Sequence, residues 1–163
     1  MRIAIGTDHR GFALKEAILA HYLSLVPQVE QLTQIPLGTA PAHWTDCGAY
    51  GAERSDYPVF AQAVCKKILR SEAELGILLC GSGGGIAIAA NRFRGIYAVV
   101  ALSEQFARAA REHDHCNVLV LPADYVTVAQ AIACIDAWLA ASPREGRYAE
   151  RLKMIDDALF TQL

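Results

Sequence analysis

Short, nearly uninterrupted apolar runs alternate along this chain with longer segments in which apolar residues recur at helical spacing. The apolar runs lie at Arg2 to Gly6, Leu75 to Cys80, Ile96 to Ala101 and Asn117 to Leu121. Strands that are apolar on both faces are typical of a parallel sheet covered by helices on both sides. The pattern therefore predicts an α/β fold with a parallel sheet.

The segments between these runs have the periodicity of helices, and the alternation predicts a doubly wound domain. Pro58 suits a first helical turn, and Ser103, like Ser55 or Asp56, is a candidate N-cap. A last helix, about Arg147 to Phe160, has no strand after it, so we expect it to pack on its own domain or on a neighbouring subunit. The other helices are expected at Gly11 to Leu25, Asp56 to Arg70, Gly84 to Arg92, Ser103 to Glu112 and Tyr125 to Ala141.

One segment, Pro27 to Ser55, lacks clear periodicity. It contains three prolines, several glycines and Trp44, and a short second strand is expected at Val29 to Leu32. A loop of this length inside a compact domain is usually functional or specific to a family. With no internal repeat or linker, residues 1–163 are expected to form a single domain.

Composition and charge exclude several classes of protein. Hydrophobic residues make up 53% of the chain and charged residues 20%, which excludes intrinsic disorder. A net charge of −2 gives no electrostatic basis for binding nucleic acid. The five scattered cysteines include no C-x-x-C pair, so reduced thiols in a cytoplasmic protein are expected. We expect no signal sequence at the N-terminus, and no apolar stretch has the length of a membrane span.

Ligands bind an open parallel sheet beyond the carboxyl ends of its strands, and candidate residues follow three of the predicted strands. Gly81 to Gly85 lie between a strand and a helix, where backbone N–H groups can hold a phosphate or an oxyanion. The segment matches neither a dinucleotide-binding fingerprint nor a P-loop, because Ile86 stands where glycine is needed and no G-K-[ST] follows. The alternative is a glycine turn that serves only tight packing.

Cys80 lies directly before this glycine segment and close to the start of a predicted helix. At such a place the pKa of a thiol can be lowered, which would make the thiolate a base or a nucleophile. The alternative is a small buried apolar residue. Cys65 and Cys134 lie within apolar helical patterns and are expected in the core.

Further polar residues carry weaker signals. Asp8 and His9 allow two interpretations. Both side chains face a ligand, or Asp8 caps a helix and His9 lies on the surface. His113 and His115 form an H-x-H pair, but further metal ligands cannot be placed. Arg147 and Arg151 are four residues apart and share a helix face, either as solvated charges or as a phosphate clamp.

Taken in order, these motifs resemble the ribose-5-phosphate isomerase type B and galactose-6-phosphate isomerase family. The resemblance covers nearly the whole chain, apart from Pro27 to Trp44, which looks like an insertion. It is carried by residues 6–11 (GTDHRG), 55–58 (SDYP), 80–86 (CGSGGGI) continuing to 88–91 (IAAN), His113 with 117–119 (NVL), and Gly146-Arg147 with Arg151.

The resemblance implies a Rossmann-like α/β/α sandwich with a five-stranded parallel sheet and an extra C-terminal helix. It implies an aldose–ketose isomerase that needs no metal or cofactor, acts on a sugar phosphate, and forms a homodimer or a dimer of dimers with sites built from two subunits. Ribose 5-phosphate is the expected substrate. The alternatives are galactose or allose 6-phosphate, a tetrulose phosphate or a free aldose, and a phosphosugar-binding module without turnover.

The resemblance also implies roles for individual residues. Cys80 would be the base that moves a proton between C1 and C2, and Ser82 would assist proton movement at the substrate oxygens. His113 would help to open the sugar ring, and Asp8 would hold sugar hydroxyls. The remaining expected substrate-binding residues are Gly81, Gly83, Gly84 and Gly85 for the enediolate, His9, Arg147 and Arg151 for the phosphate, and Asp114.

The sequence departs from the family pattern at two positions, and both carry an acidic residue. Asp114 stands where the family commonly has asparagine, and Asp124 stands where it has a further phosphate-binding arginine. An unpaired carboxylate near a phosphate would repel it. Either Arg10 or Arg144 compensates this charge, or the loop points away, or the substrate differs.

Overall fold

In the computed structural model, five parallel strands form one sheet in the order β2-β1-β3-β5-β4. The structure describes residues 1–29 and 42–158. The strands are β1 (Arg2–Thr7), β2 (His43–Asp46), β3 (Leu75–Cys80), β4 (Ala98–Val100) and β5 (Val118–Pro122). The helices are α1 (Phe12–Val29), α2 (Tyr57–Leu69), α3 (Gly84–Ala90), α4 (Glu104–Asp114), α5 (Val128–Leu139) and α6 (Arg147–Ala158).

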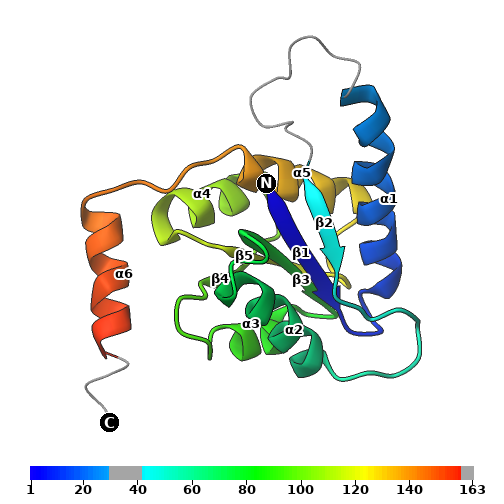
Figure 1. Cartoon of the computed structure of the whole chain (residues 1–163), viewed down its shortest axis with the longest axis horizontal. Helices are drawn as coiled ribbons and strands as arrows, with labels where there is room; N and C mark the ends of the chain where they lie inside the picture. The colour runs from blue at the N-terminus through cyan, green and yellow to red at the C-terminus, as the bar shows by residue number, and fades with distance from the viewer. Residues whose placement is uncertain (30–41, 159–163) are drawn as a thin grey trace.

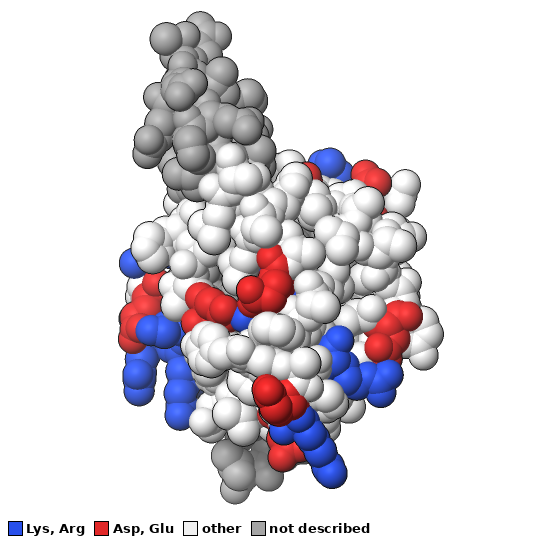
Figure 2. All heavy atoms as spheres, turned by 90° about the vertical axis from the view of Figure 1, so that its right-hand side faces the viewer, with Lys and Arg blue, Asp and Glu red and all other residues white. Residues whose placement is uncertain are grey.

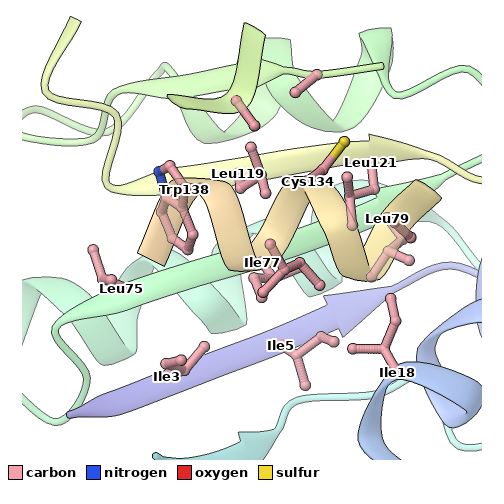
Figure 3. Close-up of a cluster of buried hydrophobic side chains, with 14 of the residues drawn as sticks. Ile3, Ile5, Ile18, Leu75, Ile77, Leu79, Leu119, Leu121, Cys134 and Trp138 are labelled. Carbon is pink, nitrogen blue, oxygen red and sulfur yellow. The ribbon is translucent and has the colours of Figure 1, made fainter. Parts of the chain in front are cut away.

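The helices cover both faces of this sheet, as Figure 1 shows. On one face α1, α4 and α5 bury an apolar cluster in which Ile5, Ile77 and Leu119 project from three neighbouring strands (Figure 3). On the other face α2 and α3 bury a second cluster that includes Leu78, Cys80 and Val120. The predicted three-layer α/β/α sandwich is therefore confirmed, because each central strand needs an apolar layer on both sides.

The second strand was predicted in the wrong place. Val29 is the last residue of α1, residues 30–32 lie outside the described residues, and the strand that pairs with β1 is β2 at residues 43–46. This edge strand is only partly buried, so its sequence HWTD lacks the apolar signature of the central strands. Of the expected insertion, residues 30–41 lie outside the described part of the chain.

The ends of several elements also differ from the expectations. The expected strand from Ile96 to Ala101 shortens to β4, and the helix expected to end at Arg92 ends at Ala90. Ser103 caps α4 as expected, because its hydroxyl accepts a hydrogen bond from the Phe106 N–H at 3.3 Å. The expected end of α6 at Phe160 lies outside the described residues.

The C-terminal helix α6 stands to one side of the sandwich (Figure 1). The hydroxyl of Tyr97, directly before the edge strand β4, donates a 2.7 Å hydrogen bond to Asp156. The Tyr148 ring stacks on His113 of α4. Met154 and Ile155 on α6 are exposed. Through these contacts α6 packs on its own chain, while part of its apolar surface remains uncovered.

The surface carries no large patch of one charge on the face drawn in Figure 2, where acidic and basic side chains are interspersed among uncharged ones. Among the described residues, no helix combines the length and the apolar character that crossing a membrane requires.

Candidate active site

The sheet brings the ends of β1 and β3 together at the point where the chain changes faces. Helix α1, which follows β1, lies on one face of the sheet, and helix α2, which precedes β3, lies on the other. Strands β1 and β3 are neighbours in the sheet. Crevices beyond the carboxyl ends of such strands are the usual ligand sites of this architecture. The loops that follow Thr7 and Cys80 therefore define the candidate site.

The loop after β1 holds Asp8 in a nearly buried position beside the end of β3. The Asp8 carboxylate accepts the Arg10 N–H at 3.0 Å, and the Thr7 hydroxyl donates to the Leu79 carbonyl at 3.0 Å. Gly11 permits this close approach, because a Cβ there would lie 2.8 Å from the Leu79 Cβ. Asp8 is thus both a loop-capping carboxylate and a side chain at the candidate site.

His9 is held by Ser55, from the segment before α2. The His9 N–H donates to the Ser55 hydroxyl at 3.0 Å, and His9 Nδ1 lies 3.1 Å from the Ser55 carbonyl oxygen and 3.3 Å from its nitrogen. These contacts engage Nδ1, which leaves Nε2 as the ring nitrogen for a ligand.

The glycine segment turns sharply from β3 into α3. Gly83 is the N-cap of α3 with φ of 77°, a conformation that favours glycine, and the Ser82 hydroxyl accepts the Gly84 N–H at 3.4 Å. The backbone N–H groups of Ser82, Gly83 and Ile86 lie near enough to the Cys80 thiol to lower its pKa. The turn therefore brings backbone N–H groups near the thiol.

The expected lowering of the Cys80 pKa is wrong. Burial raises the pKa of the thiol, which is only 5% exposed, and the negative charge of Asp8 raises it further. The N–H groups of the glycine loop lower the pKa but do not outweigh burial. The resting thiol is therefore protonated at neutral pH. Cys65 and Cys134 are buried in the core as expected.

Tyr57, at the start of α2, lies over the glycine loop, and the sequence pattern did not predict this placement. A Cβ on Gly85 would lie 2.7 Å from the Tyr57 Cζ and 2.9 Å from its hydroxyl oxygen, so glycine at 85 makes room for this ring. The signal available in the sequence was Pro58, which marks the first turn of α2 and so places Tyr57 at the start of that helix.

The two acidic departures have different surroundings. Asp124 forms an ion pair with Arg10. Of Arg10 and Arg144, the residue that compensates the charge of Asp124 is therefore Arg10. Arg144 instead pairs with Glu112 at 2.5 Å. Asp114 is exposed at the end of α4.

The remaining predicted residues form a second cluster at the opposite end of the sheet. Helix α4 starts beyond the carboxyl end of β4 and its 11 residues carry the chain back to the amino end of β5, a rise of about 16 Å. At this far end the ring of His113 stacks on Tyr148, with centroids 4.7 Å apart, and Arg147 Nη2 donates to the Tyr148 hydroxyl at 3.1 Å. Arg151 lies one turn along α6. One chain therefore does not bring His113, Arg147 or Arg151 to Cys80.

The H-x-H pair does not converge on a common point. His113 stacks on Tyr148, whereas His115 adopts a left-handed backbone conformation and its Nε2 lies 2.7 Å from the Arg144 carbonyl oxygen. Within residues 1–29 and 42–158, no three His, Cys, Asp or Glu side chains are grouped in a way that could hold a metal ion.

A buried thiol among backbone donors, with a carboxylate beside it, can move a proton at carbon while N–H groups receive the charge that develops on oxygen. The fold and this site together define the class of protein: an α/β enzyme.

Comparison with known proteins places the chain within this class. A family model described as Ribose/Galactose Isomerase matches residues 3–155. Ribose-5-phosphate isomerase B of Escherichia coli strain K12 is 38% identical over 154 residues, which cover 94% of this chain and 93% of that protein.

Solved structures agree with the sequence comparison. A ribose 5-phosphate isomerase from Thermotoga maritima matches with a TM-score of 0.84 and 38% identity, covering 96% of this chain and 97% of that chain. Ribose-5-phosphate isomerase B from Mycoplasma genitalium, solved with bound ribulose-5-phosphate, matches with a TM-score of 0.82 and 34% identity, covering 97% of this chain and 95% of that chain. The chain belongs to the ribose/galactose isomerase family.

Proposed function

We propose that this aldose–ketose isomerase interconverts ribose 5-phosphate and ribulose 5-phosphate, with Cys80 as the base. The reported relatives are named ribose-5-phosphate isomerases, and one of them holds ribulose 5-phosphate. The observation that carries the assignment of the base is the place of the buried Cys80 thiol at the end of β3, directly before the glycine loop and within reach of the charge of Asp8.

The reaction moves one proton between neighbouring carbons. In the open-chain aldose, the Cys80 thiolate removes the proton from C2, and the electron pair of that bond shifts to give an enediolate. The thiol then returns the proton to C1. A proton passes from O2 to O1, so the aldehyde becomes a hydroxyl group, the C2 hydroxyl becomes the ketone, and atoms balance without a further reactant.

The glycine loop lowers the energy of the enediolate. Backbone N–H groups aimed at a developing oxyanion are worth roughly 3 to 4 kcal/mol per donor in measured cases. Ser82, exposed at the rim of the loop, assists proton movement between O1 and O2. Asp8 accepts hydrogen bonds from sugar hydroxyls, and His9 Nε2 faces the phosphate.

The raised pKa of Cys80 has a direct consequence for the rate. The base must be deprotonated, and burial disfavours the thiolate. The fraction of active enzyme therefore increases as the pH rises through the alkaline range. A base of high pKa also accepts the carbon proton more readily, which partly offsets its low population.

Two copies of the chain complete each site. His113, Arg147 and Arg151 lie at the far end of the sheet from Cys80, so they act in the site of a partner subunit, where His113 opens the sugar ring and the arginines hold the phosphate. The uncovered apolar surface of α6 at Met154 and Ile155 supports this arrangement. The assembly is a homodimer or a dimer of dimers.

The proposal also includes the domain organisation of the enzyme and its cell compartment. Residues 1–163 form one sugar-phosphate isomerase domain. The protein works in the cytoplasm, which is supported by its five free cysteines, four of them buried.

The test is a direct isomerase assay on purified protein with a panel of aldose phosphates. We expect turnover of ribose 5-phosphate that increases with pH. Changing Cys80 to Ala is expected to lower kcat at least about a hundredfold, as for loss of a positioned general base, while ribose 5-phosphate still binds. The matched control is Cys65→Ala, which truncates a buried cysteine of α2 and is expected to cost stability rather than kcat.

Three results would contradict the proposal. Nearly unchanged turnover in folded Cys80→Ala would exclude the thiol as the base. Efficient turnover of a hexose 6-phosphate or a free aldose without turnover of ribose 5-phosphate would show that ribose 5-phosphate is not the substrate. Binding of a sugar phosphate without any turnover would indicate a sugar-phosphate receptor.

A further inference from the structure

The ion pair between Arg10 and Asp124 lies directly over the glycine loop. A Cβ on Gly81 would lie 2.6 Å from Arg10 Nε and 2.7 Å from Asp124 Oδ2, so a side chain at this position would displace the pair. The pair joins the loop after β1 to the loop after β5 and spans the end of β3 between them. It therefore belongs to the rim of the candidate site.

Backbone contacts fix both partners in this position. The Arg10 N–H donates to the Asp8 carboxylate at 3.0 Å, and the Asp124 N–H donates to the Gly81 carbonyl at 3.0 Å. The carbonyl of Cys80 accepts the Ala123 N–H at 2.9 Å, which anchors the start of the same loop. Although the Arg10 side chain is 57% exposed, its two attachment points are parts of the site itself.

The guanidinium and the Cys80 thiol lie on different sides of the strand end. The thiol packs with the cluster beneath α2 and α3. Successive residues of an extended chain project to opposite sides, and the space next to Gly81 is the space that Arg10 and Asp124 occupy. When C1 and C2 of the substrate lie at the Cys80 thiol, Arg10 faces a part of the substrate that is farther from these carbons.

The chemistry of the pair suits a phosphate at that distance. A guanidinium has five N–H donors in a planar fork that matches phosphate oxygens, and the ion pair with Asp124 engages Nη2. An exposed arginine without a partner would lose side-chain entropy when it bound an anion. A carboxylate that already orients the guanidinium reduces that loss.

We propose that Arg10 binds the substrate phosphate and that Asp124 is the residue that positions it. The proposal rests on the proposed function for the identity of the substrate. If the pair acts in this way, removing Arg10 weakens phosphate binding for two reasons: a cation is lost, and the Asp124 carboxylate is exposed to the phosphate.

The experiment measures KM and kcat for ribose 5-phosphate and the inhibition constant of inorganic phosphate in five variants. Arg10→Ala is expected to raise KM and the inhibition constant about tenfold, the lower range for a charged hydrogen bond, with kcat within about twofold of the parent. Arg10→Lys keeps the charge and recovers part of this loss. Arg70→Ala, which removes an exposed arginine at the end of α2, is the matched control and leaves both constants unchanged.

The sign of the Asp124→Asn effect tests positioning. With Arg10 present, we expect Asp124→Asn to raise KM about threefold, because the guanidinium loses its anchor. In the Arg10→Ala background the same change should lower KM, because it removes an uncompensated negative charge. A merely structural tie between two loops would lower the melting temperature without this reversal of sign.

Three outcomes would overturn the proposal: an unchanged KM in Arg10→Ala, a fall in kcat with unchanged phosphate inhibition, or a lowered KM in Asp124→Asn alone. Calorimetric binding of ribose 5-phosphate in the Cys80→Ala background separates this proposal from the proposed function. If the parent enzyme binds ribose 5-phosphate without turning it over, the proposed function fails while Arg10 is still tested by the change in Kd.

Discussion

Replacing Lys15 by Met would test how the first loop of the site is supported. Lys15, in the first turn of α1, has a fully buried side chain, and its Nζ lies 2.5 Å from Asp46 Oδ2 and 3.0 Å from Glu16 Oε1. The same ammonium lies 5.6 Å from the ring centroid of Phe12 and 5.4 Å from that of Tyr50. Methionine keeps most of the length of the side chain but removes the charge.

The expected cost follows from what Asp46 retains. Breaking a buried ion pair usually costs about 3 to 5 kcal/mol, because the remaining charge is left without a partner. The Asp46 side chain is 28% exposed and still accepts the Gly48 N–H at 2.8 Å, so water and this hydrogen bond offset part of the loss. We expect the free energy of unfolding to fall by about 2 to 3 kcal/mol, which lowers Tm by roughly 5 to 10 °C.

The change should also reach the site. Asp46 holds the Gly48 N–H, the Gly48 carbonyl accepts the Thr7 N–H at 2.7 Å, and Asp8 follows directly. Loosening this connection displaces the Asp8 carboxylate relative to the glycine loop. Because small displacements reduce catalysis markedly, we expect kcat/KM for ribose 5-phosphate to fall about tenfold.

Urea unfolding at constant m-value measures the loss of stability. The double variant Lys15→Met/Asp46→Asn should recover part of it, because it removes the unpaired carboxylate. Lys66→Met, at an exposed position of α2, is the control and should lie within about 0.5 kcal/mol of the parent. An unchanged free energy of unfolding in Lys15→Met, or a double variant less stable than the single one, would refute the reasoning.

Two further predictions concern assembly and pH. Mixing inactive Cys80→Ala with inactive His113→Ala under conditions of subunit exchange should restore about a quarter of the parent activity, because half of the dimers are mixed and each contains one intact composite site; a mixture that stays inactive would place the site within one chain. Burial raises the pKa of Cys65 and of Cys116 to about 12, above the ordinary value of 9.0. Both thiols therefore stabilise the fold fully below pH 9, and this contribution is lost as the pH rises towards 12, so unfolding experiments should show a steep loss of stability that Cys116→Ala reduces.

The amino-acid sequence was sufficient for the architecture because burial on two faces leaves a strong pattern. β1, β3 and β5 are almost continuously apolar, since helices cover them on both sides, and the glycine segment after β3 marks the loop where the chain turns into α3. The ordered motifs from Asp8 to Arg151 were enough to indicate the family. These features depend on local residue choice, so the sequence alone determined them.

Other features depend on groups that are distant in sequence, and only the tertiary structure decided them. The edge strand β2 escaped prediction because partial burial leaves it with polar residues. The pKa of Cys80 is raised because burial and the charge of Asp8, 72 residues away, outweigh the helix-start amides that the sequence pattern emphasised. The pairing of Arg10 with Asp124 and the position of Tyr57 over Gly85 likewise arise only when the sheet aligns its strand ends. Local sequence encodes periodicity and turns, whereas desolvation and charge pairing depend on which loops the topology brings together.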